Sequence, residues 1–342
     1  MSEKPLLSIC IPTYNRAEYL AKSLDTLVCL PEFNSSEVEV VISDNASTDN
    51  TQEVAKKYLD QYSNIHYYRN DENIRDKNFP TSITRANGTF RKLCNDTLIY
   101  SGGYLAYLLY NIKTYQKDRP FLFFPNHNLG KKQKDQYECT DINDFLRITS
   151  FYITWIGGFG FWEDELLLID DWFAGTETFL WQTKILLDIL SKKNAMVVLN
   201  KQKVSVQDVQ KKDISYGLYN VFYKNYLQLL KNKIECGIVD QSCYNFLRKD
   251  ILLNFFSLWI TNYNLNKQKY HTAASEDNIE DLITRAYKND SYFILFLCKV
   301  RFLLYKQKLK NLIKRFLKGA IENTIHITKR ILQIFVIFPE YM

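Results

Sequence analysis

Short apolar runs alternate with amphipathic stretches between residues 6 and 199. The nearly continuous apolar run Leu6–Pro12 and the β-branched run Val38–Ile42 are typical of strands that are buried on both faces of a sheet. Between these runs, Leu20, Leu24 and Leu27 recur at the spacing of one helix face. The pattern therefore predicts a strand, a helix and a second strand in that order.

The same alternation continues along the chain. Further strands are expected over Ile65–Tyr68, Thr89–Cys94, Pro120–Phe124 and Ala195–Leu199. Further helices are expected around Val54, Tyr58 and Tyr62, over Gly103–Tyr115 and over Thr178–Leu190. Strands that alternate with helices indicate an α/β fold with a mostly parallel sheet and helices on both faces.

The pattern changes after residue 215, where helical spacing continues and strand-like runs stop. Helices are expected over Tyr216–Lys231, Asp240–Asn262, Asn278–Lys288 and Ser291–Thr328. We therefore expect an α/β domain over residues 1–205 and a helical C-terminal region over residues 206–342.

Three polar motifs stand at the ends of predicted strands. They are Pro12–Arg16 (PTYNR), Asp44–Asp49 (DNASTD) and Asn95–Thr97 (NDT). Taken singly, each could be a turn or a helix cap, because Asp, Asn, Ser and Thr favour both. Ligands of open parallel sheets bind beyond the carboxyl ends of the strands. Three such motifs at one edge therefore favour a binding site.

The formal charge of +6 is concentrated at the C-terminal end. Residues 299–342 contain 10 Lys and Arg and 2 Glu, whereas the preceding 298 residues contain 34 Lys and Arg and 36 Asp and Glu. An apolar stripe runs along this basic segment at three- to four-residue steps: Phe302, Tyr305, Leu309, Leu312, Ile313, Phe316, Leu317, Ile321 and Ile325. The pattern is typical of a helix in a membrane interface, and a helix packed on the rest of the chain is the alternative. We expect an anionic membrane surface as a partner.

Cysteine usage and the N-terminus indicate the compartment. The seven scattered cysteines form no C-x-x-C pair, which suits a reducing compartment better than a disulfide framework or a zinc site. The opening MSEKPLLSIC lacks the basic segment and apolar core of a secretory signal, and no apolar run reaches the roughly 18–20 residues that span a bilayer. We expect a cytoplasmic protein that is peripheral on the inner face of the cell membrane.

Several function classes lack their motifs. The sequence has no Walker loop and no G-x-G-x-x-G, which argues against a nucleoside triphosphatase or a dehydrogenase. The four histidines are too far apart to suggest a metal cluster. The basic tail alone would suit nucleic acid, but it shows no recognised nucleic-acid-binding fold, so we expect no nucleic acid partner.

Family 2 glycosyltransferases of the GT-A fold open with similar motifs. This sequence has Ser8–Arg16 (SICIPTYNR), Val41–Thr51 (VISDNASTDNT), Asn73–Asn78 and Ala86–Phe90 in the same order. The resemblance is specific over residues 6–100 and weaker to about residue 200, and it is strongest to the abequosyltransferase-like bacterial enzymes that build O-antigen or capsule. It implies an inverting enzyme that moves a sugar from a nucleotide-diphosphate donor to a glycan or lipid-linked acceptor.

The resemblance also implies roles for residues at the strand ends. Pro12, Thr13 and Tyr14 would line the nucleotide pocket, with Tyr14 beside the base and ribose. Asp44 would accept a hydrogen bond from the N3–H of uracil or thymine, which implies a UDP- or dTDP-linked donor. Lys77 or Arg75 would approach the diphosphate.

The motif Asn95-Asp96-Thr97 matches the metal motif of the family only in part. The family usually has acids in this cluster. Here the first position is Asn95, which by resemblance would contact the nucleotide-sugar donor, and the third position is Thr97. By resemblance, Asp96 and Thr97 would hold Mn²⁺ or Mg²⁺ together with diphosphate oxygens, because such hard cations prefer oxygen ligands. The alternative is a simple turn.

The resemblance implies a catalytic carboxylate in the second half of the domain. Glu177 stands before the apolar helix at the position expected for the base, and its alternative role is to stabilise the helix N-terminus. The other acids available are Glu163, Asp164, Glu165, Asp170 and Asp171. The aromatic, Gly-containing segment Trp155–Trp162 would form either an acceptor wall or part of the core.

Two other functions compete with sugar transfer. A non-catalytic GT-A-like protein that binds a nucleotide-sugar or a glycan would explain the missing acids in the NDT motif, and donor turnover with and without EDTA separates it from an enzyme. A nucleic-acid binder rests on the basic tail alone and would bind less tightly at high salt.

Overall fold

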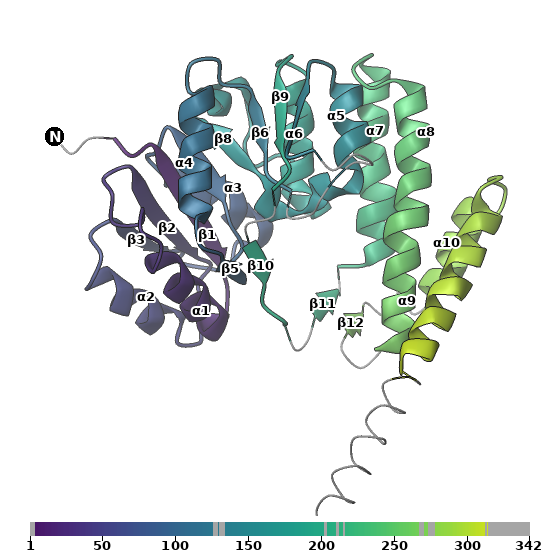
Figure 1. Ribbon diagram of the computed structural model, residues 1–342, viewed down its shortest axis with the longest axis horizontal. Coiled ribbons are helices and arrows are strands. Elements are labelled where there is room, and N and C mark those ends of the chain that lie inside the picture. Colours follow the sequence, from purple (N-terminus) through teal and green to yellow (C-terminus); the bar gives the residue numbers. More distant parts are fainter. Residues whose placement is uncertain are drawn as a thin grey trace, which may run out of the picture. The chain divides into compact units, whose positions relative to one another are not determined.

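The computed structural model describes residues 4–125, 129, 134–201, 204–209, 212–214, 216–266, 270–272, 278–311 and 313. Its largest sheet has five strands in the order β3-β2-β1-β4-β8 (Figure 1). They are β1 (Leu7–Thr13), β2 (Val38–Asp44), β3 (Ile65–Arg69), β4 (Phe90–Leu93) and β8 (Gly160–Trp162). The first four run parallel, and β8 runs antiparallel to β4. The expected mostly parallel α/β sheet is confirmed.

Smaller sheets accompany it within the described residues. β6 (Phe121–Phe123) pairs in parallel with β9 (Met196–Leu199), which pairs antiparallel with β7 (Gln136–Cys139). β5 (Leu98–Tyr100) pairs antiparallel with β10 (Val204–Val206), and β11 (Lys212–Ile214) pairs in parallel with β12 (Tyr270–Thr272). We did not predict β5, β7, β8 and β10, because three or four residues are too few to display an alternating pattern.

Helices cover both faces of the five-stranded sheet. α1 (Ala17–Val28), α2 (Thr51–Leu59) and α4 (Tyr104–Tyr115) share one apolar core with Leu7, Ile9 and Ile11 of β1. α3 (Asn78–Thr84) packs on β1, β2 and β4, but its buried Ile83 lies outside that core. Because successive strand residues point to opposite faces, α3 covers the other face.

Burial of one face explains why α1 forms where the apolar spacing predicts it. Leu20, Leu24 and Leu27 are each 0% exposed, and burial of each such side chain stabilises the fold by roughly 1.5–3 kcal/mol. Arg16 at the start of the helix provides no side-chain cap. Asp49 does so from the loop after β2, because its Oδ2 accepts a hydrogen bond from the backbone N–H of Ala17 over 3.0 Å. The helix is therefore fixed to the strand ends.

The remaining helices lie mostly in the second half of the chain. They are α5 (Ile142–Thr149), α6 (Trp181–Leu190), α7 (Tyr226–Glu235), α8 (Gln241–Asp250), α9 (Ser257–Leu265), α10 (Ile279–Tyr287) and a helical segment over residues 293–311. Short π-helical stretches, Asn220–Asn225 and Ile251–Phe256, precede α7 and α9. The expected helical C-terminal region is confirmed, and the part of the predicted helix Ser291–Thr328 beyond Ile313 lies outside the described residues.

Two compact units make up the chain. One contains Met1–Ile251 and Lys269–Leu282, and the other contains Leu252–Gln268 and Ile283–Met342. The sequence boundary between residues 205 and 206 stays a prediction. Within the described ranges, no helix is both long enough and apolar enough to cross a membrane.

Candidate active site

The three polar motifs follow strand ends that are neighbours in the sheet. Thr13, the last residue of β1, lies opposite Asp44, the last residue of β2. The backbone N–H of Cys94, just after β4, donates to the carbonyl of Cys10 over 2.8 Å. Two residues later, Oδ2 of Asp96 accepts a hydrogen bond from Oγ1 of Thr13 over 2.9 Å. The structure therefore brings the first and third motifs into direct contact at the carboxyl edge of the sheet.

Asp96 is a buried carboxylate in an ion pair. It is 3% exposed, and Nη1 of Arg16 donates to its Oδ1 over 3.1 Å. Burial raises the pKa of Asp96, and the Arg16 guanidinium and the Thr13 hydroxyl oppose that rise. No role was predicted for Arg16 from the sequence. The signal that could have found it was its position as the only basic residue in the PTYNR motif.

The two neighbours of Asp96 differ in their environment. Thr97 is buried, and its carbonyl accepts a hydrogen bond from the backbone N–H of Gln207 over 2.9 Å. Oδ1 of Asn95 is buried and has no hydrogen-bond partner in the described chain. This oxygen lies against Gly157, where an added Cβ would be 2.9 Å away. Asn95 therefore faces the loop at Gly157, with an acceptor that the described protein does not satisfy.

The residues around Asp96 do not fit a divalent cation. The described residues contain no group of three or more His, Cys, Asp or Glu side chains that could hold a metal ion. Oδ1 of Asp96 already accepts a hydrogen bond from Arg16, so a divalent ion on this oxygen would have to displace the guanidinium or lie beside a like charge. The open acceptor on Asn95 is neutral and does not offset that charge. The metal role of Asp96 and Thr97 stays a prediction that these surroundings disfavour.

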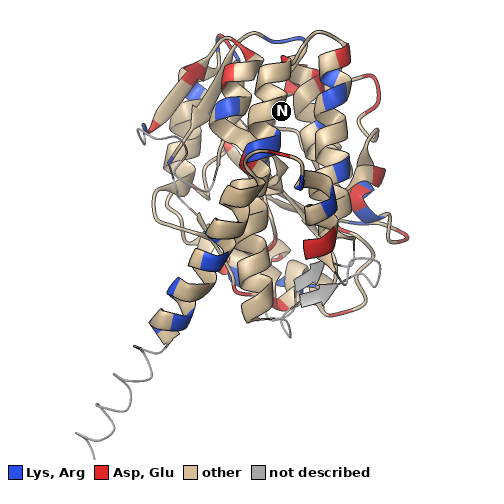
Figure 2. Ribbon diagram, turned by 90° about the vertical axis from the view of Figure 1, so that its right-hand side faces the viewer, with Lys and Arg blue, Asp and Glu red and all other residues tan. Residues whose placement is uncertain are grey.

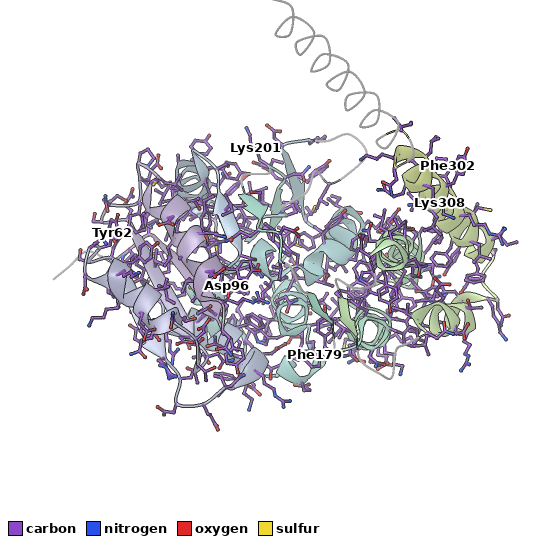
Figure 3. The ribbon with its side chains drawn as sticks, turned by 90° about the horizontal axis from the view of Figure 1, so that it is seen from below. Tyr62, Asp96, Phe179, Lys201, Phe302 and Lys308 are labelled. Atoms are coloured by element: carbon purple, nitrogen blue, oxygen red, sulfur yellow. The ribbon has the colours of Figure 1, made fainter. Side chains whose placement is uncertain are left out.

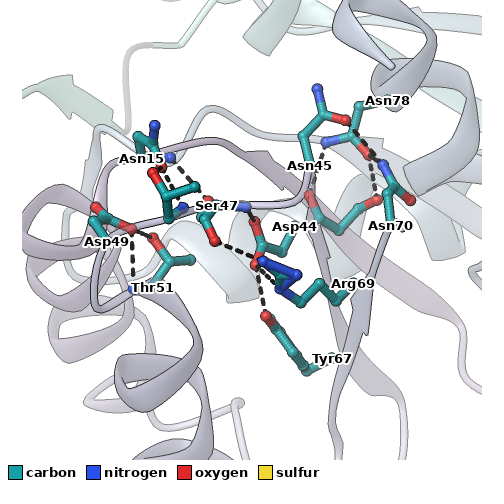
Figure 4. A network of polar contacts seen from close by, with 12 residues as sticks. Asn15, Asp44, Asn45, Ser47, Asp49, Thr51, Tyr67, Arg69, Asn70 and Asn78 are labelled. Carbon is teal, nitrogen blue, oxygen red and sulfur yellow. Dashed lines mark hydrogen bonds and ion pairs between the residues drawn. The ribbon is translucent and has the colours of Figure 1, made fainter. Parts of the chain in front are cut away.

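Asp44 is fully buried, and both of its carboxylate oxygens are engaged (Figure 4). Oδ1 accepts from the backbone N–H of Ser47 over 3.0 Å, and Oδ2 accepts from the hydroxyl of Tyr67 over 2.6 Å. Nε of Arg69 lies 3.7 Å from Oδ2. To read a pyrimidine base, Asp44 would have to use a remaining lone pair. That role stays a prediction, and the contacts show that Asp44 holds the loop after β2 in place.

The turn after β1 exposes an aromatic ring. Pro12 is buried, whereas Tyr14 is 42% exposed. Asn15 has a φ of 51°, and its Oδ1 accepts from the backbone N–H of Thr48 over 2.7 Å. This bond holds the turn against the loop after β2, and the Tyr14 ring is left exposed to solvent.

Asparagine side chains connect the loop after β3 to the end of β2 (Figure 4). Nδ2 of Asn70 donates to Oδ1 of Asn45 and of Asn78 over 3.0 and 3.1 Å. Nδ2 of Asn45 donates to the carbonyl of Arg75 over 3.2 Å. Because these buried amides satisfy one another, they fix the short 3₁₀ helix η1 (Arg75–Lys77) beside the strand ends.

Two exposed cations flank a carboxylate on η1. Arg75 and Lys77 are exposed, and neither forms an ion pair within the described part of the chain. Asp76 is half-buried, and burial raises its pKa to about 6. Both cations are therefore free to meet an anion, so the choice between Lys77 and Arg75 stays open.

Glu177 lies on a second 3₁₀ helix, η5 (Thr176–Thr178), beside η1. Its side chain is exposed and makes no hydrogen bond or ion pair with any described residue. Gly175 and Phe179 on either side have φ values of 89° and 57°. A positive φ is costly for a bulky residue such as Phe and is retained where the surroundings enforce it. The fold thus sets a carboxylate that is unpaired among the described residues on a short helix that contacts η1.

Three of the preceding acids are paired within the structure. Asp164 forms an ion pair with Arg119 over 2.7 Å, and Glu163 lies 3.5 Å from the same guanidinium. Glu165 is fully buried and pairs with Lys193 over 2.5 Å. Asp170, Asp171 and Glu177 remain as exposed candidates, and Glu177 lies on η5, which packs against η1.

The aromatic segment Trp155–Trp162 is mostly core, and its Trp155 is half-buried. Three of its side chains are 0% exposed: Phe159, Phe161 and Trp162. A fully buried ring cannot stack on a sugar, so the core alternative holds for them. Exposed rings stand instead near Glu177, where Phe179 and Tyr216 have centroids 5.8 Å apart.

Comparison with known proteins places the strand-end motifs in a family. The model described as glycosyl transferase family 2 matches residues 8–161. Residues 8–161 form a glycosyl transferase family 2 domain. The resemblance stated from the sequence motifs is confirmed.

Curated relatives match shorter segments of this domain. Abequosyltransferase RfbV of Salmonella typhimurium is 45% identical over 87 residues, which cover 25% of this chain and 26% of the relative. An uncharacterized glycosyltransferase of Mycoplasma pneumoniae is 42% identical over 67 residues, which cover 20% and 22%. The chain therefore matches about a quarter of the length of these curated relatives.

Solved structures extend the likeness of fold. TarS 1–349 of S. aureus in complex with UDP-GlcNAc has a TM-score of 0.55 at 18% identity and covers 74% of this chain and 75% of that one. Mannosyltransferase PcManGT of Pyrobaculum calidifontis, in complex with GDP-Man and Mn²⁺, has a TM-score of 0.54 at 13% identity and covers 91% and 88%. At these identities the likeness concerns the fold alone, and the GT-A expectation for the fold is confirmed.

Proposed function

We propose that this protein is a glycosyltransferase that moves a sugar from a nucleotide-diphosphate donor to a glycan or lipid-linked acceptor in the synthesis of a surface polysaccharide. The observation that carries the proposal is the hydrogen bond between Thr13 and Asp96. It joins the two strand-end motifs at the carboxyl edge of a parallel sheet, within a family 2 domain. The O-antigen-type product is supported by the identity to abequosyltransferase RfbV.

The donor would lie across the strand ends. Tyr14 offers an exposed ring to the base. Arg75 and Lys77 offer unpaired cations to the diphosphate, and charge-assisted hydrogen bonds to phosphate are roughly twice as strong as neutral ones. We infer a UDP- or dTDP-linked donor because Asp44 would accept a hydrogen bond from a uracil or thymine base.

The reaction assigned to this site is a single displacement. The acceptor hydroxyl oxygen attacks the anomeric carbon, and a new C–O bond forms while the bond between that carbon and the diphosphate oxygen breaks. The electron pair of the broken bond leaves with the nucleoside diphosphate, and the hydroxyl proton passes to the carboxylate of Glu177. Attack from the side opposite the leaving group inverts the configuration.

Nucleotide selectivity tests the proposal at its first step. We expect UDP and dTDP to raise the melting temperature of the full chain more than GDP or CMP, because the pocket would accept a small ring with an imide edge. Asp44→Asn should remove this preference. A larger shift with GDP would exclude Asp44 as a pyrimidine reader, and no shift with any nucleotide would contradict the proposed donor class.

A non-catalytic nucleotide-sugar-binding protein is the second candidate. The observation that favours it is the single carboxylate in the NDT motif. It predicts nucleotide binding without release of nucleotide from a nucleotide-sugar, whether or not EDTA is present. The exposed, unpaired Glu177 beside η1 favours the enzyme, because a binding protein has no need for a base at that place.

A membrane surface is the partner that we propose for the C-terminal segment. Along residues 293–313, large apolar side chains are exposed, including Phe302 (62%), Tyr305 (66%) and Ile313 (51%). Lys and Arg recur along the same segment (Figure 2), where Lys308 lies close along the helix to Phe302 (Figure 3). Such a helix suits an anionic membrane interface, on the inner face of the cell membrane. The rest of the predicted stripe lies outside the described residues: Leu312, Phe316, Leu317, Ile321 and Ile325.

A further inference from the structure

The charge that faces Asp96 is supplied by the protein itself. Arg16 and Asp96 form an ion pair in which the carboxylate side chain is 5% exposed and the guanidinium side chain is 46% exposed. Asp96 is thus the fixed, buried partner, and Arg16 reaches from it toward solvent at the edge where the strands end. Thr13 holds the other oxygen of Asp96, so the carboxylate has little freedom to turn.

Most of the donors of Arg16 remain open. A guanidinium carries five N–H donors in a planar fork, and one of these nitrogens, Nη1, binds Asp96. No other side-chain hydrogen bond or ion pair connects Arg16 to a residue that the structure describes. The fork matches phosphate geometry and keeps its charge at any physiological pH. A buried anchor with an open fork is the arrangement expected of an anion-binding arginine.

We propose that Arg16, oriented by Asp96, takes the place of a divalent metal ion and neutralises the diphosphate of the donor. The inference rests on the proposed function and concerns how that function is carried out. Asp96 is then a positioning residue for Arg16, and transfer needs no added metal. The poor fit of a divalent ion beside Arg16, described above, is then a property of the mechanism.

The role of Arg16 in the reaction step is electrostatic. As the bond between the anomeric carbon and the diphosphate oxygen breaks, its electron pair stays on that oxygen and negative charge grows there. Arg16 donates hydrogen bonds to this charge and neither gives up nor gains a proton or an electron. Arg75 and Lys77 on η1 provide the further positive charge that a diphosphate requires.

Binding of UDP and dTDP to the full chain in excess EDTA, measured by calorimetry, tests the inference without relying on turnover. We expect the wild-type protein to bind at least one of them in EDTA, and Mn²⁺ to change its affinity by less than about twofold. Arg16→Gln should weaken this binding roughly 10- to 100-fold, the loss of a hydrogen bond to a charged group. Arg16→Lys should retain part of it, because the charge remains and the fork is lost. Lys57→Gln, the same charge change on α2, should have no effect.

The role of Asp96 is tested by a double-mutant cycle. Asp96→Asn and Arg16→Gln should each weaken nucleotide binding in EDTA. The double variant should bind no more weakly than Arg16→Gln alone, because both substitutions disrupt the same Arg16–Asp96 ion pair. In the turnover assay, added guanidinium ions should partly restore Arg16→Ala and should not affect Lys57→Ala. Melting temperatures of all variants report whether each one folds.

Each result decides between the alternatives. The inference is overturned if nucleotide binding or turnover requires Mn²⁺ and Arg16→Gln binds nucleotide as the wild type does. That result leaves the proposed function intact. Additive losses in the double variant overturn the role of Asp96 as a positioning residue. Absence of nucleotide binding and of turnover both with Mn²⁺ and with EDTA overturns the inference and the proposed function together.

Discussion

Asp96 is the single carboxylate of its motif, and it holds Arg16 and Thr13 at the same time. Asp96→Ala removes both contacts, so we expect transfer to fall at least about a hundredfold, the usual cost of losing one electrostatic contact in an active site. Thr97→Ala should have a much smaller effect. Release of nucleotide from the donor measures both rates, and circular dichroism checks folding. A turnover close to wild type in Asp96→Ala would mean that the motif is only a turn.

Glu177 has a narrower role, because it is exposed and unpaired among the described residues. Glu177→Gln keeps the shape of the side chain but cannot take a proton. We expect unchanged UDP affinity and a loss of transfer of roughly 10²- to 10⁴-fold, the typical contribution of a general base. Glu235→Gln, the same change at an exposed glutamate at the end of α7, is the control. If the rate survives in Glu177→Gln, the base lies elsewhere, and Asp164 or Asp171 is examined next.

At the scale of elements, η1 carries a titratable group that affects stability. Burial raises the pKa of Asp76 from 3.8 to about 6, so the folded state binds the proton more tightly than the unfolded state. Its contribution to stability is therefore complete below about pH 4 and is lost as the pH rises through 6. Asp76→Asn should flatten the decline of the melting temperature over this range and raise it at neutral pH. Asp71→Asn, at an exposed acid in the same loop, reports the effect of net charge alone. Equal slopes of melting temperature against pH in Asp76→Asn and the wild type would contradict the raised pKa of Asp76.

The approach of β4 to β1 depends on a glycine. A Cβ at Gly88 would lie 2.8 Å from the backbone nitrogen of Ser8 and closer still to its Oγ. Because backbone cannot yield as a flexible side chain can, Gly88→Ala should lower the free energy of unfolding by about 1–3 kcal/mol. Gly102→Ala meets nothing within 4 Å and should change it by less than about 0.5 kcal/mol. Urea denaturation of both variants measures the difference, and equal values would refute the close packing.

The same elements show which features the sequence could predict. β1 and β2 could be predicted because both faces of each strand are buried, so the apolar run is continuous. The polar motifs could be predicted to lie together, because the strands that precede them are parallel and end at the same edge of the sheet. The Arg16–Asp96 pair could not be predicted, because it joins residues 80 positions apart. The pairing of Glu165 with Lys193 was hidden for the same reason, which left several acids as candidates for the base.

At the scale of the whole molecule, the basic C-terminal segment should decide where the protein works. We expect the full chain to sediment with vesicles that contain anionic lipid, and high salt to release much of it, because salt screens exposed charges. Exposed apolar side chains along residues 293–313 would add a contribution that salt does not remove.

Two variants separate these contributions to vesicle binding. Truncation before Lys299 should abolish vesicle binding. A triple variant with Glu in place of Lys306, Lys308 and Lys310 should weaken vesicle binding, most of all at low salt. Neutral vesicles and unchanged transfer to a water-soluble acceptor are the controls. Equal sedimentation of the truncated chain, or none of the full chain, would leave the segment as a packing helix.

The strand-end site is proposed to turn over a nucleotide-sugar. The most direct measurement incubates the full chain with UDP-, dTDP- and GDP-linked sugars in the absence of acceptor and quantifies the nucleoside diphosphate released. We expect slow release from a UDP- or dTDP-linked sugar by the wild-type protein and a loss of this release in Asp96→Ala. Release from no donor, or release that Asp96→Ala leaves unchanged, would refute the proposed activity of the site.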